Sequence, residues 1–450
     1  MGTLFGTDGI RGQANRHPVT CEIALKLGKA IGRVVDAGGY GSRKVVLGKD
    51  TRLSGYMIET ALTSGLVSMG VDVLLVGPVP TPAVAHLVRS LAADMGIMVT
   101  ASHNPFDDNG IKIFGADGFK LDDATEEELE RLIASDDLSS SAIRSDQIGK
   151  AFRIDDACGR YIEFAKVSIG TRPLKGIRIV LDCANGAAYW IAPTIFRELG
   201  AEVIAIHDRP DGRNINNECG ALHPEHMAGL VRQRQATFGI ALDGDADRVI
   251  FADEHGAIVD GDRILAICAR DYKQRGLLAG DTIVCTSMSN LGLHDAMRRI
   301  GVSVATTDVG DRKVIEAMRE GGFRLGGEKS GHLIFLDYAT TGDGIMSALY
   351  VARLLVETGR TLGDLARDCM DEYPQKLVSL PVREKPPIPE IPALADAIGR
   401  AAADLGGTGR VIVRYSGTER KIRLLVEAAT EEKVGFWMDR LVEAVHASLS

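Results

Sequence analysis

Short apolar runs recur along the chain in a regular order, with stretches of helical periodicity between them. In three successive segments these runs occupy 44–47, 71–76 and 95–99, then 177–181, 203–206 and 238–242, and then 282–285, 302–305 and 323–325. Nearly continuous apolar runs that alternate with helices are typical of largely parallel strands covered on both faces. The pattern therefore predicts three α/β domains of similar plan.

The segment between the first two runs shows the helical periodicity most clearly. Ser54 is a residue type that favours an N-cap, and the apolar residues after it fall on one helical face: Met57, Ile58, Ala61, Leu62 and Leu66. This spacing predicts an amphipathic helix that packs on the sheet.

The C-terminal part of the chain has a different pattern. A strand-like run at 376–382 precedes a proline-rich stretch at 386–392, and two further runs follow at 411–413 and 422–426. A last helix is expected from Thr430, with these residues on its apolar face: Val434, Trp437, Met438, Leu441 and Val445. The fold class expected is therefore α/β, with three similar mixed-sheet domains at 1–150, 151–255 and 256–370 and a C-terminal α+β domain at 371–450.

Unusual polar residues collect just after the third run of each α/β segment. They form the strings TASHN at 100–104, DGDADR at 243–248 and GGEKSGH at 326–332. In α/β sheets, ligands bind beyond the carboxyl ends of the strands. Three equivalent loops would thus make one composite site, which places the domains around a central cleft.

The aspartates of the second string indicate a metal site. Asp243, Asp245 and Asp247 alternate, so an open loop can direct all three carboxylates the same way. Crowded carboxylates need a cation, and hard oxygen ligands suit Mg²⁺. An EF-hand also begins with alternating aspartates, but Arg248 stands where its turn needs glycine, and a strand-like run follows at 249–252.

Ser102 and a loop near the C-terminus complete the candidate chemistry. Ser102 lies between an apolar run and the turn residues Asn104 and Pro105, and beside a magnesium site its oxygen can carry a phosphoryl group. No G-x-S-x-G elbow is present, which argues against acyl hydrolysis. The string RYSGT at 414–418 combines an arginine, hydroxyls and glycine in a tight loop suited to an anion.

Composition narrows the possible partners. The formal net charge of −9 argues against nucleic acid, and no apolar run approaches the length of a membrane span. The N-terminus lacks the features of a signal peptide, and seven scattered cysteines without a C-x-x-C pair indicate reduced thiols rather than a disulfide frame or a zinc site. We expect a soluble cytoplasmic protein.

Together these motifs resemble those of the α-D-phosphohexomutase family. The strings DGDADR and TASHNP are each fairly specific, and the match extends from FGTDGIRG at 5–12 to the loop at 414–418. The resemblance implies that Ser102 carries a phosphoryl group. It also implies that one Mg²⁺ per subunit is bound by Ser102, Asp243, Asp245 and Asp247.

The resemblance also assigns roles to residues outside the metal site. Glu328 and Ser330 would bind sugar hydroxyls. The reacting end would be served, as charge stabilisers or proton carriers, by Arg11, Lys112, Arg248 and His332. The phosphate that is not transferred would be bound by Arg414, Ser416, Gly417 and Thr418. Tyr415 and Arg420 depart from the family loop, which often has proline after the arginine and at its end.

Within the family the chain is most similar to the amino-sugar branch. The residues that indicate this are the strings INNECGALHPE at 215–225 and GEKSGH at 327–332, and Asp311 after Val309-Gly310. That branch interconverts glucosamine 6-phosphate and glucosamine 1-phosphate through a bisphosphate, feeding UDP-N-acetylglucosamine and cell-wall synthesis. Glucosamine or glucose 1,6-bisphosphate would be the activator. A phosphomannomutase/phosphoglucomutase and a non-catalytic sugar-phosphate binding protein stay open as alternatives, as do a homodimer and an activating kinase.

Overall fold

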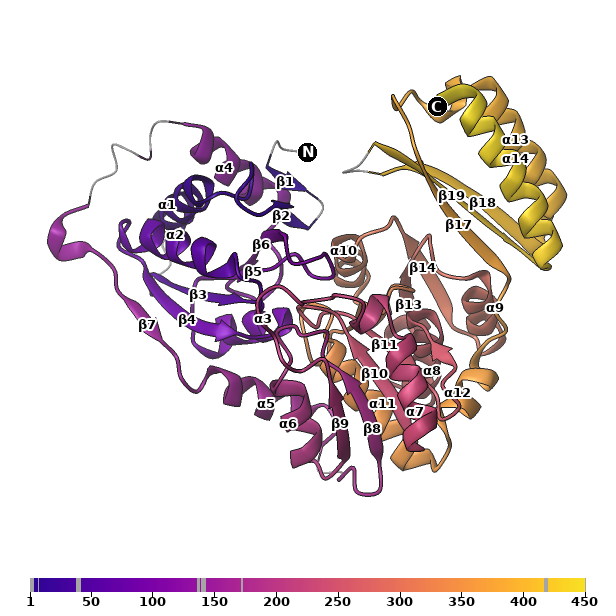
Figure 1. The fold of residues 1–450 in the computed structure, drawn as a ribbon, viewed down its shortest axis with the longest axis horizontal. Helices are drawn as coiled ribbons and strands as arrows, with labels where there is room; N and C mark the ends of the chain where they lie inside the picture. Colours follow the sequence, from indigo (N-terminus) through magenta and orange to yellow (C-terminus); the bar gives the residue numbers. More distant parts are fainter. Residues whose placement is uncertain are drawn as a thin grey trace. The chain divides into compact units, whose positions relative to one another are not determined.

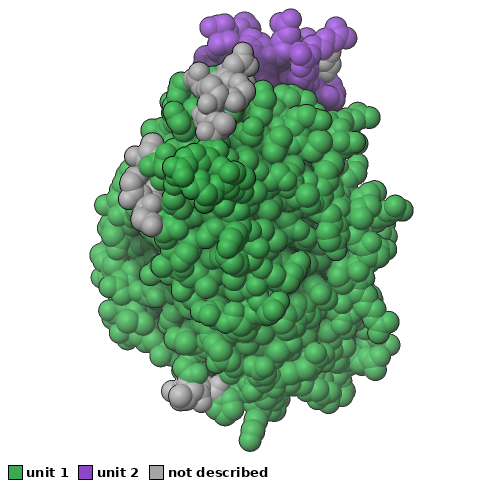
Figure 2. All heavy atoms as spheres, turned by 90° about the vertical axis from the view of Figure 1, so that its left-hand side faces the viewer, with its two compact units in different colours: residues 1–287, 304–367 green, residues 288–303, 368–450 purple. Residues whose placement is uncertain are grey.

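A computed structural model describes residues 4–6, 8–37, 42–135, 138, 143–170, 173–416 and 420–449. The chain forms two compact units, one of residues 1–287 and 304–367 and the other of residues 288–303 and 368–450 (Figure 2). Within the described residues the strands form four sheets (Figure 1). Three sheets belong to the first unit and one to the second.

The first sheet has the order β1-β2-β6-β5-β3-β4-β7. Its strands are β1 (Phe5–Gly6), β2 (Gly9–Gln13), β3 (Lys44–Lys49), β4 (Asp72–Pro78), β5 (Met95–Val99), β6 (Asp108–Gly115) and β7 (Ala151–Arg153). β3 is parallel to β4 and β5, whereas β6 is antiparallel to β5 and β2. The helices are α1 (Cys21–Ala37), α2 (Gly55–Val67), α3 (Thr81–Ser90) and α4 (Asp123–Ala134). α1 packs against α2 and α4, and α3 packs against β3 and β5.

The second sheet has the order β12-β11-β10-β8-β9, with β8 parallel to β9 and β10. Its strands are β8 (Arg178–Asp182), β9 (Glu202–Ile206), β10 (Phe238–Leu242), β11 (Val249–Ala252) and β12 (Ile258–Val259). β11 runs antiparallel to β10 and to β12. The helices of this region are α5 (Ala157–Val167), α6 (Ile191–Glu198) and α7 (Glu225–Arg234).

The third sheet has the order β14-β13-β15-β16, with β15 parallel to β13 and antiparallel to β16. Its strands are β13 (Thr282–Thr286), β14 (Ser303–Thr307), β15 (Leu325–Gly327) and β16 (Leu333–Phe335). The helices near it are α8 (Gly261–Gln274), α10 (Asp311–Gly321), α11 (Gly344–Thr358) and α12 (Leu362–Cys369).

A common plan explains where the motif loops lie. Each loop joins a strand with a parallel neighbour to an antiparallel strand that returns beside it: β5 to β6, β10 to β11, and β15 to β16. The nine runs predicted by the sequence analysis each overlap a strand of these sheets, the last one, at 323–325, only at Leu325, and neither β6 nor β16 was predicted. These returning strands make the sheets mixed, as the predicted fold class states.

The second unit contains the predicted α+β module. Its sheet has the order β17-β19-β18, and both neighbours of the central strand are antiparallel to it. The strands are β17 (Gln375–Pro381), β18 (Gly409–Tyr415) and β19 (Lys421–Ala428), and the helices are α9 (Leu291–Arg299), α13 (Pro392–Leu405) and α14 (Glu431–Leu449). The apolar face predicted for the last helix is correct, since all five of its residues lie in the core of this unit.

The N-cap predicted at Ser54 can be checked against local structure. Ser54 occupies the N-cap position of α2, but its side chain makes no capping hydrogen bond. Its Oγ instead accepts a hydrogen bond of 2.8 Å from Asn109 Nδ2 on β6.

All seven cysteines lie in the described residues, and none forms a disulfide. Among the described helices, none has the length and apolarity required to span a bilayer.

Asp343 is a buried carboxylate at the start of α11. It accepts hydrogen bonds from Met346 N at 2.9 Å and from Tyr161 Oη, which lies 2.9 and 2.8 Å from its two oxygens. Burial raises the pKa of Asp343 to about 6, although these hydrogen bonds act in the opposite direction. Compared with the unfolded chain, the folded state therefore favours the protonated form of this side chain.

We expect Asp343→Asn to raise the unfolding temperature at about pH 7.5 and to lose this advantage near pH 4. The folded-state pKa of about 6 exceeds the ordinary value of 3.8, so stability from this group is complete below about pH 4 and is lost as pH rises to about 6. Asparagine caps helices as well as aspartate and carries no charge. Thermal unfolding at several pH values measures the effect.

The control is Asp122→Asn at the N-cap of α4. There the hydrogen bond from Thr125 N lowers the pKa of an exposed carboxylate, so its charge stabilises the fold above that pKa. This variant should lose stability at about pH 7.5 rather than gain it. Equal destabilisation of Asp343→Asn at both pH values would show that burial of the charge is not the dominant effect.

Candidate active site

Ser102 lies in the loop between β5 and β6 with its side chain turned toward the second sheet. Its Oγ donates a hydrogen bond of 2.7 Å to Asp243 Oδ2 and lies 3.2 Å from His103 Nδ1. The residue is 1 % exposed and has a φ of 51°, in the left-handed region. That conformation costs a non-glycine residue about 1–2 kcal/mol, so the surrounding contacts must hold it.

Asp243, Asp245 and Asp247 are buried in the loop between β10 and β11, and each offers an oxygen within 4.8 Å of the others. Thr81 Oγ1 donates a 2.6 Å hydrogen bond to Asp245 Oδ2. Among the described residues, the buried Oδ1 atoms of Asp245 and Asp247 have no hydrogen-bond partner. Such unsatisfied carboxylate oxygens fit a divalent cation with hard oxygen ligands, such as Mg²⁺.

Gly244 allows the metal loop to approach the serine loop. A Cβ atom at this position would lie 2.6 Å from Ser102 O and 2.7 Å from Asn216 Nδ2. Both distances are too short for van der Waals contact, so any larger residue here would push the two loops apart. The glycine of the DGDADR string is therefore required for the contact between Ser102 and Asp243.

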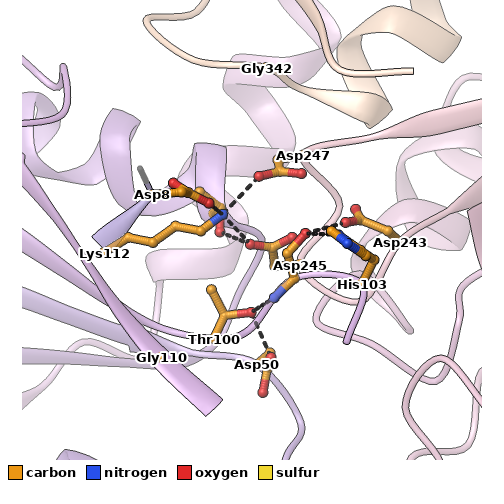
Figure 3. A network of polar contacts seen from close by, with 12 residues as sticks. Asp8, Asp50, Thr100, His103, Gly110, Lys112, Asp243, Asp245, Asp247 and Gly342 are labelled. Carbon is orange, nitrogen blue, oxygen red and sulfur yellow. Dashed lines mark hydrogen bonds and ion pairs between the residues drawn. The ribbon is translucent and has the colours of Figure 1, made fainter. Parts of the chain in front are cut away.

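Lys112 on β6 balances part of the negative charge (Figure 3). Its Nζ lies 3.0 Å from Asp245 Oδ2, 2.9 Å from Asp247 Oδ2 and 3.4 Å from Asp8 Oδ2. Burial opposes the charged ammonium, but these carboxylates outweigh it and raise the pKa of Lys112. Lys112 is therefore a permanently charged part of the site.

The three aspartates differ in their electrostatic surroundings. Burial and the charges of the other two carboxylates raise the pKa of Asp243 well above its ordinary value. Burial also acts to raise the pKa of Asp247, but Lys112 and His332 outweigh it and hold that pKa well below its ordinary value. Asp243, which contacts Ser102, is thus the carboxylate most in need of further positive charge.

Two arginines supply positive charge on the serine side. Among the described residues, the buried Nε atoms of Arg11 and Arg248 have no hydrogen-bond partner. Arg11 also forms an ion pair with Asp8, and Arg248 Nε lies 3.9 Å from Asp247 Oδ1. Burial and these two guanidinium groups lower the pKa of His103 to about 4, so its imidazole is neutral at pH 7. This environment suits an anion near Ser102.

The third loop contributes Glu328, Ser330 and His332. Glu328 Oε1 accepts from Gly310 N at 3.1 Å, and its Oε2 lies 3.4 Å from Ser330 Oγ. His332 is buried, its Nε2 accepts from Gly342 N at 3.2 Å, and its Nδ1 lies 3.7 Å from Asp247 Oδ1. Burial lowers the pKa of His332, but the nearby carboxylates outweigh it and the net shift is upward.

The structure therefore brings together the three predicted loops of the first unit, as expected. The fourth loop belongs to the second unit, where Ser416 N donates to Lys421 O at 2.8 Å and Ser416 O accepts from Lys385 Nζ at 2.6 Å. Gly417 and Thr418 lie outside the described residues. Tyr415, one of the departures from the family loop, donates from its hydroxyl to Pro386 O at 2.7 Å and so braces the start of the loop.

Sequence reasoning missed several charged residues around the site. Asp8 contacts Arg11, Lys112 and Lys120, and Lys120 also pairs with Asp311 at the start of α10. Asp8 lies inside the FGTDGIRG string, so a carboxylate beside the expected arginine was an available signal. Lys120 has no comparable signal, because only the fold brings it to Asp8 and Asp311.

A second group of metal-ligand residue types lies in the second sheet region. Asp182, His207 and Cys219 offer atoms within 4.8 Å of one another. However, Asp182 already accepts hydrogen bonds from Ala184 N, Gly220 N and His207 Nδ1, at 2.8, 3.0 and 2.9 Å. These bonds account for the cluster as a brace for the segment between β8 and α7.

Sequence models of one family match almost the whole chain. The models are Phosphoglucomutase/phosphomannomutase alpha/beta/alpha domain I at residues 2–140, domain II at 159–256, domain III at 260–373 and the C-terminal domain at 377–444. Curated relatives named phosphoglucosamine mutase include one from Anaeromyxobacter dehalogenans, 53 % identical and covering 94 % of both chains. Another, from Geobacter sp. strain M21, is 51 % identical and covers 100 % of this chain and 99 % of its own.

Solved structures share the fold. A phosphoglucomutase/phosphomannomutase family protein from Burkholderia thailandensis matches with a TM-score of 0.80 and 26 % identity, covering 98 % of this chain and 97 % of its own. N-acetylphosphoglucosamine mutase from Aspergillus fumigatus, solved with GlcNAc-6P and magnesium, matches with a TM-score of 0.63 and 18 % identity, covering 99 % and 95 %. The second likeness supports the fold alone.

We expect Thr81→Val to weaken divalent metal binding by about 10–100-fold, because hydrogen bonds that orient a metal ligand carry that much affinity. Valine keeps the shape of threonine but removes the hydroxyl that donates to Asp245. Titration of the purified protein with Mn²⁺, followed by electron paramagnetic resonance, measures the affinity without turnover. Thr63→Val is the matched control, since that hydroxyl donates to Glu59 O within α2, at 2.7 Å. Equal affinity in the two variants would contradict the assignment.

Proposed function

This chain belongs to the phosphoglucomutase/phosphomannomutase family, and we propose that it interconverts glucosamine 6-phosphate and glucosamine 1-phosphate through a phosphorylated Ser102. The observation that carries the proposal is the 2.7 Å contact between Ser102 Oγ and Asp243 within the three buried carboxylates. The amino-sugar substrate is supported by the curated relatives, which share 51–53 % identity and are named for it.

In the proposed reaction, a phosphoryl group moves from Ser102 to the free hydroxyl of the sugar monophosphate. The bond from phosphorus to Oγ breaks, a bond to the sugar oxygen forms, and the hydroxyl proton leaves. The resulting bisphosphate turns around, and its other phosphoryl group moves to Ser102. The guanidinium groups of Arg11 and Arg248, with unpartnered Nε atoms, are positioned to bind the equatorial oxygens during transfer.

Asp243, Asp245, Asp247 and the oxygen of Ser102 would hold Mg²⁺, whose charge offsets that on the phosphoryl oxygens. The two unsatisfied carboxylate oxygens support this assignment. Lys112 keeps Asp245 and Asp247 oriented by its hydrogen bonds of 3.0 and 2.9 Å. His332, buried beside Asp247, is the proposed proton carrier, and the permanently charged Lys112 is a charge stabiliser.

The remaining proposed roles are supported by the family match. Glu328 and Ser330 bind sugar hydroxyls, and the loop of Arg414, Ser416, Gly417 and Thr418 binds the phosphate that stays on the sugar. Four domains are proposed, with boundaries near residues 150, 255 and 370. A glucosamine or glucose 1,6-bisphosphate is the proposed activator, because it can deliver a phosphoryl group to an unphosphorylated Ser102.

Ser102→Ala should abolish turnover while leaving the fold intact, because alanine removes only the oxygen that carries the phosphoryl group. Intact-mass spectrometry after incubation with Mg²⁺ and glucose 1,6-bisphosphate should show one added phosphoryl group on the wild type and none on the variant. Ser64→Ala, which removes an exposed hydroxyl on α2, is the control and should be phosphorylated normally. Near-normal turnover by Ser102→Ala would end the covalent mechanism.

Glucosamine 1-phosphate should be preferred over glucose 1-phosphate, with mannose 1-phosphate slowest. A polar contact left without its partner costs about 1–3 kcal/mol, which corresponds to a rate change of roughly ten-fold to a few hundred-fold. The test compares kcat/KM for the three 1-phosphates at one Mg²⁺ and activator concentration. A preference for glucose or mannose 1-phosphate would replace the amino-sugar assignment with a phosphoglucomutase or phosphomannomutase activity. Absence of turnover on all three would favour a sugar-phosphate binding protein.

A further inference from the structure

Arg52, just after β3, has a fully buried side chain that is absent from the reaction described above. Its guanidinium donates to backbone carbonyls of the serine loop rather than to any ligand. The contacts are Nη2 to Ser102 O at 3.0 Å and to Asn104 O at 2.8 Å, and Nη1 to Asp108 O at 3.0 Å and to Pro105 O. One side chain thus binds four carbonyls of the segment that carries Ser102.

Asp50 orients this guanidinium and connects it to the same loop by a second route. Its Oδ2 accepts from Arg52 Nε at 2.9 Å and from Thr100 Oγ1 at 2.7 Å, the contact between Asp50 and Thr100 in Figure 3. Thr100 Oγ1 in turn accepts from Ser102 N at 2.9 Å. Hydrogen bonds therefore hold both the N–H and the C=O of Ser102.

Asn216 reaches the same carbonyls from the second sheet region. Its Nδ2 donates to Ser102 O at 2.8 Å and to Asn104 O at 3.0 Å. Its own backbone is fixed by a hydrogen bond from Asn216 N to Ala184 O at 2.9 Å. The carbonyl oxygen of Ser102 therefore accepts hydrogen bonds from Arg52, in the domain that supplies the serine, and from Asn216, in the domain that supplies the aspartates.

We propose that Arg52, oriented by Asp50 and joined by Asn216, is a positioning residue that fixes Ser102 for phosphoryl transfer. The inference rests on the proposed function. Burying a guanidinium is unfavourable, and apolar packing would stabilise the fold as well or better. Both terminal nitrogens of Arg52, Nη1 and Nη2, donate to the serine loop, where the backbone of Ser102 is strained at a φ of 51°. This placement indicates a role in geometry.

Arginine is required because its planar fork presents donors in several fixed directions, whereas a lysine ammonium cannot reach four carbonyls at once. We expect Arg52→Lys to keep the buried charge but to let Ser102 Oγ move away from Asp243. A misplacement of about 1 Å lowers the rate of a positioned reaction by roughly 10²-fold. The effect should fall on kcat and leave KM unchanged, because the side-chain hydrogen bonds described for Arg52 go to Asp50 and to the loop that carries Ser102.

The experiment uses full-length wild type, Arg52→Lys, Asn216→Gly and the control Lys49→Met. Glycine adopts the left-handed backbone of Asn216, at a φ of 56°, without strain, so Asn216→Gly removes the donor and adds no charge. Lys49 is a neighbouring buried cation whose Nζ pairs with Glu59 on α2 and does not contact the serine loop. Lys49→Met therefore tests whether altering a nearby buried cation is enough to slow transfer.

Each protein is first phosphorylated with glucose 1,6-bisphosphate and quantified by intact mass. Single-turnover transfer from phosphorylated Ser102 to glucosamine 1-phosphate is then followed by rapid quench, with KM from steady-state assays and thermal unfolding recorded alongside. We expect transfer to slow by roughly 10²-fold in Arg52→Lys, by a smaller factor in Asn216→Gly, and not at all in Lys49→Met.

Wild-type transfer rates in folded Arg52→Lys and Asn216→Gly would overturn the positioning role. A slowed Lys49→Met would also overturn it, because altering any nearby buried cation would then suffice. If Arg52→Lys does not fold, Asn216→Gly decides the question. Failure of the wild type itself to accept a phosphoryl group at Ser102 would instead refute the proposed function, so the two failures are distinguishable.

Discussion

The mutual repulsion of three buried carboxylates governs the rest of the site. Asp243, Asp245 and Asp247 lie within 4.8 Å of one another in surroundings that screen charge poorly. Lys112 offsets part of that charge from β6, at 2.9 Å from Asp247 and 3.0 Å from Asp245. The remaining charge falls most heavily on Asp243, where Ser102 supplies only a neutral donor. A site balanced in this way has affinity for a cation beside the serine.

The repeated strand plan explains how such a cluster can be assembled from distant parts of the chain. Each motif loop leaves the carboxyl end of a strand and returns antiparallel beside it, which keeps the loop short and fixes its direction. Loops of this kind can be brought within hydrogen-bonding distance without disturbing the sheets beneath them. Gly244 then sets how closely the first two loops approach, since a Cβ there would collide with Ser102 O.

The sequence singled out the groups proposed to do the chemistry more completely than the groups proposed to position them. Ser102 and the aspartates stand in short strings whose residue types and spacing imply their chemistry. Thr81 and Arg52 stand in no such string, because their partners lie far along the chain: Asp245 for Thr81, and the loop beginning at Ser102 for Arg52. A single sequence contains no local pattern that records those contacts. β6 and β16 were missed for a different reason. Asn109 and Lys112 interrupt the apolar run of β6, and β16 has only 3 residues.

Burial of the site has a consequence for the proposed chemistry. A phosphoserine that waits between substrates must transfer its phosphoryl group to a sugar and not to water. Ser102, Lys112 and His332 are each 1 % exposed, so bulk water has little access to the serine oxygen or to the groups that would activate a nucleophile. Water exclusion also strengthens the electrostatic interactions on which transfer depends. The tight hold on the serine and its low exposure would therefore limit hydrolysis of a phosphoserine between substrates.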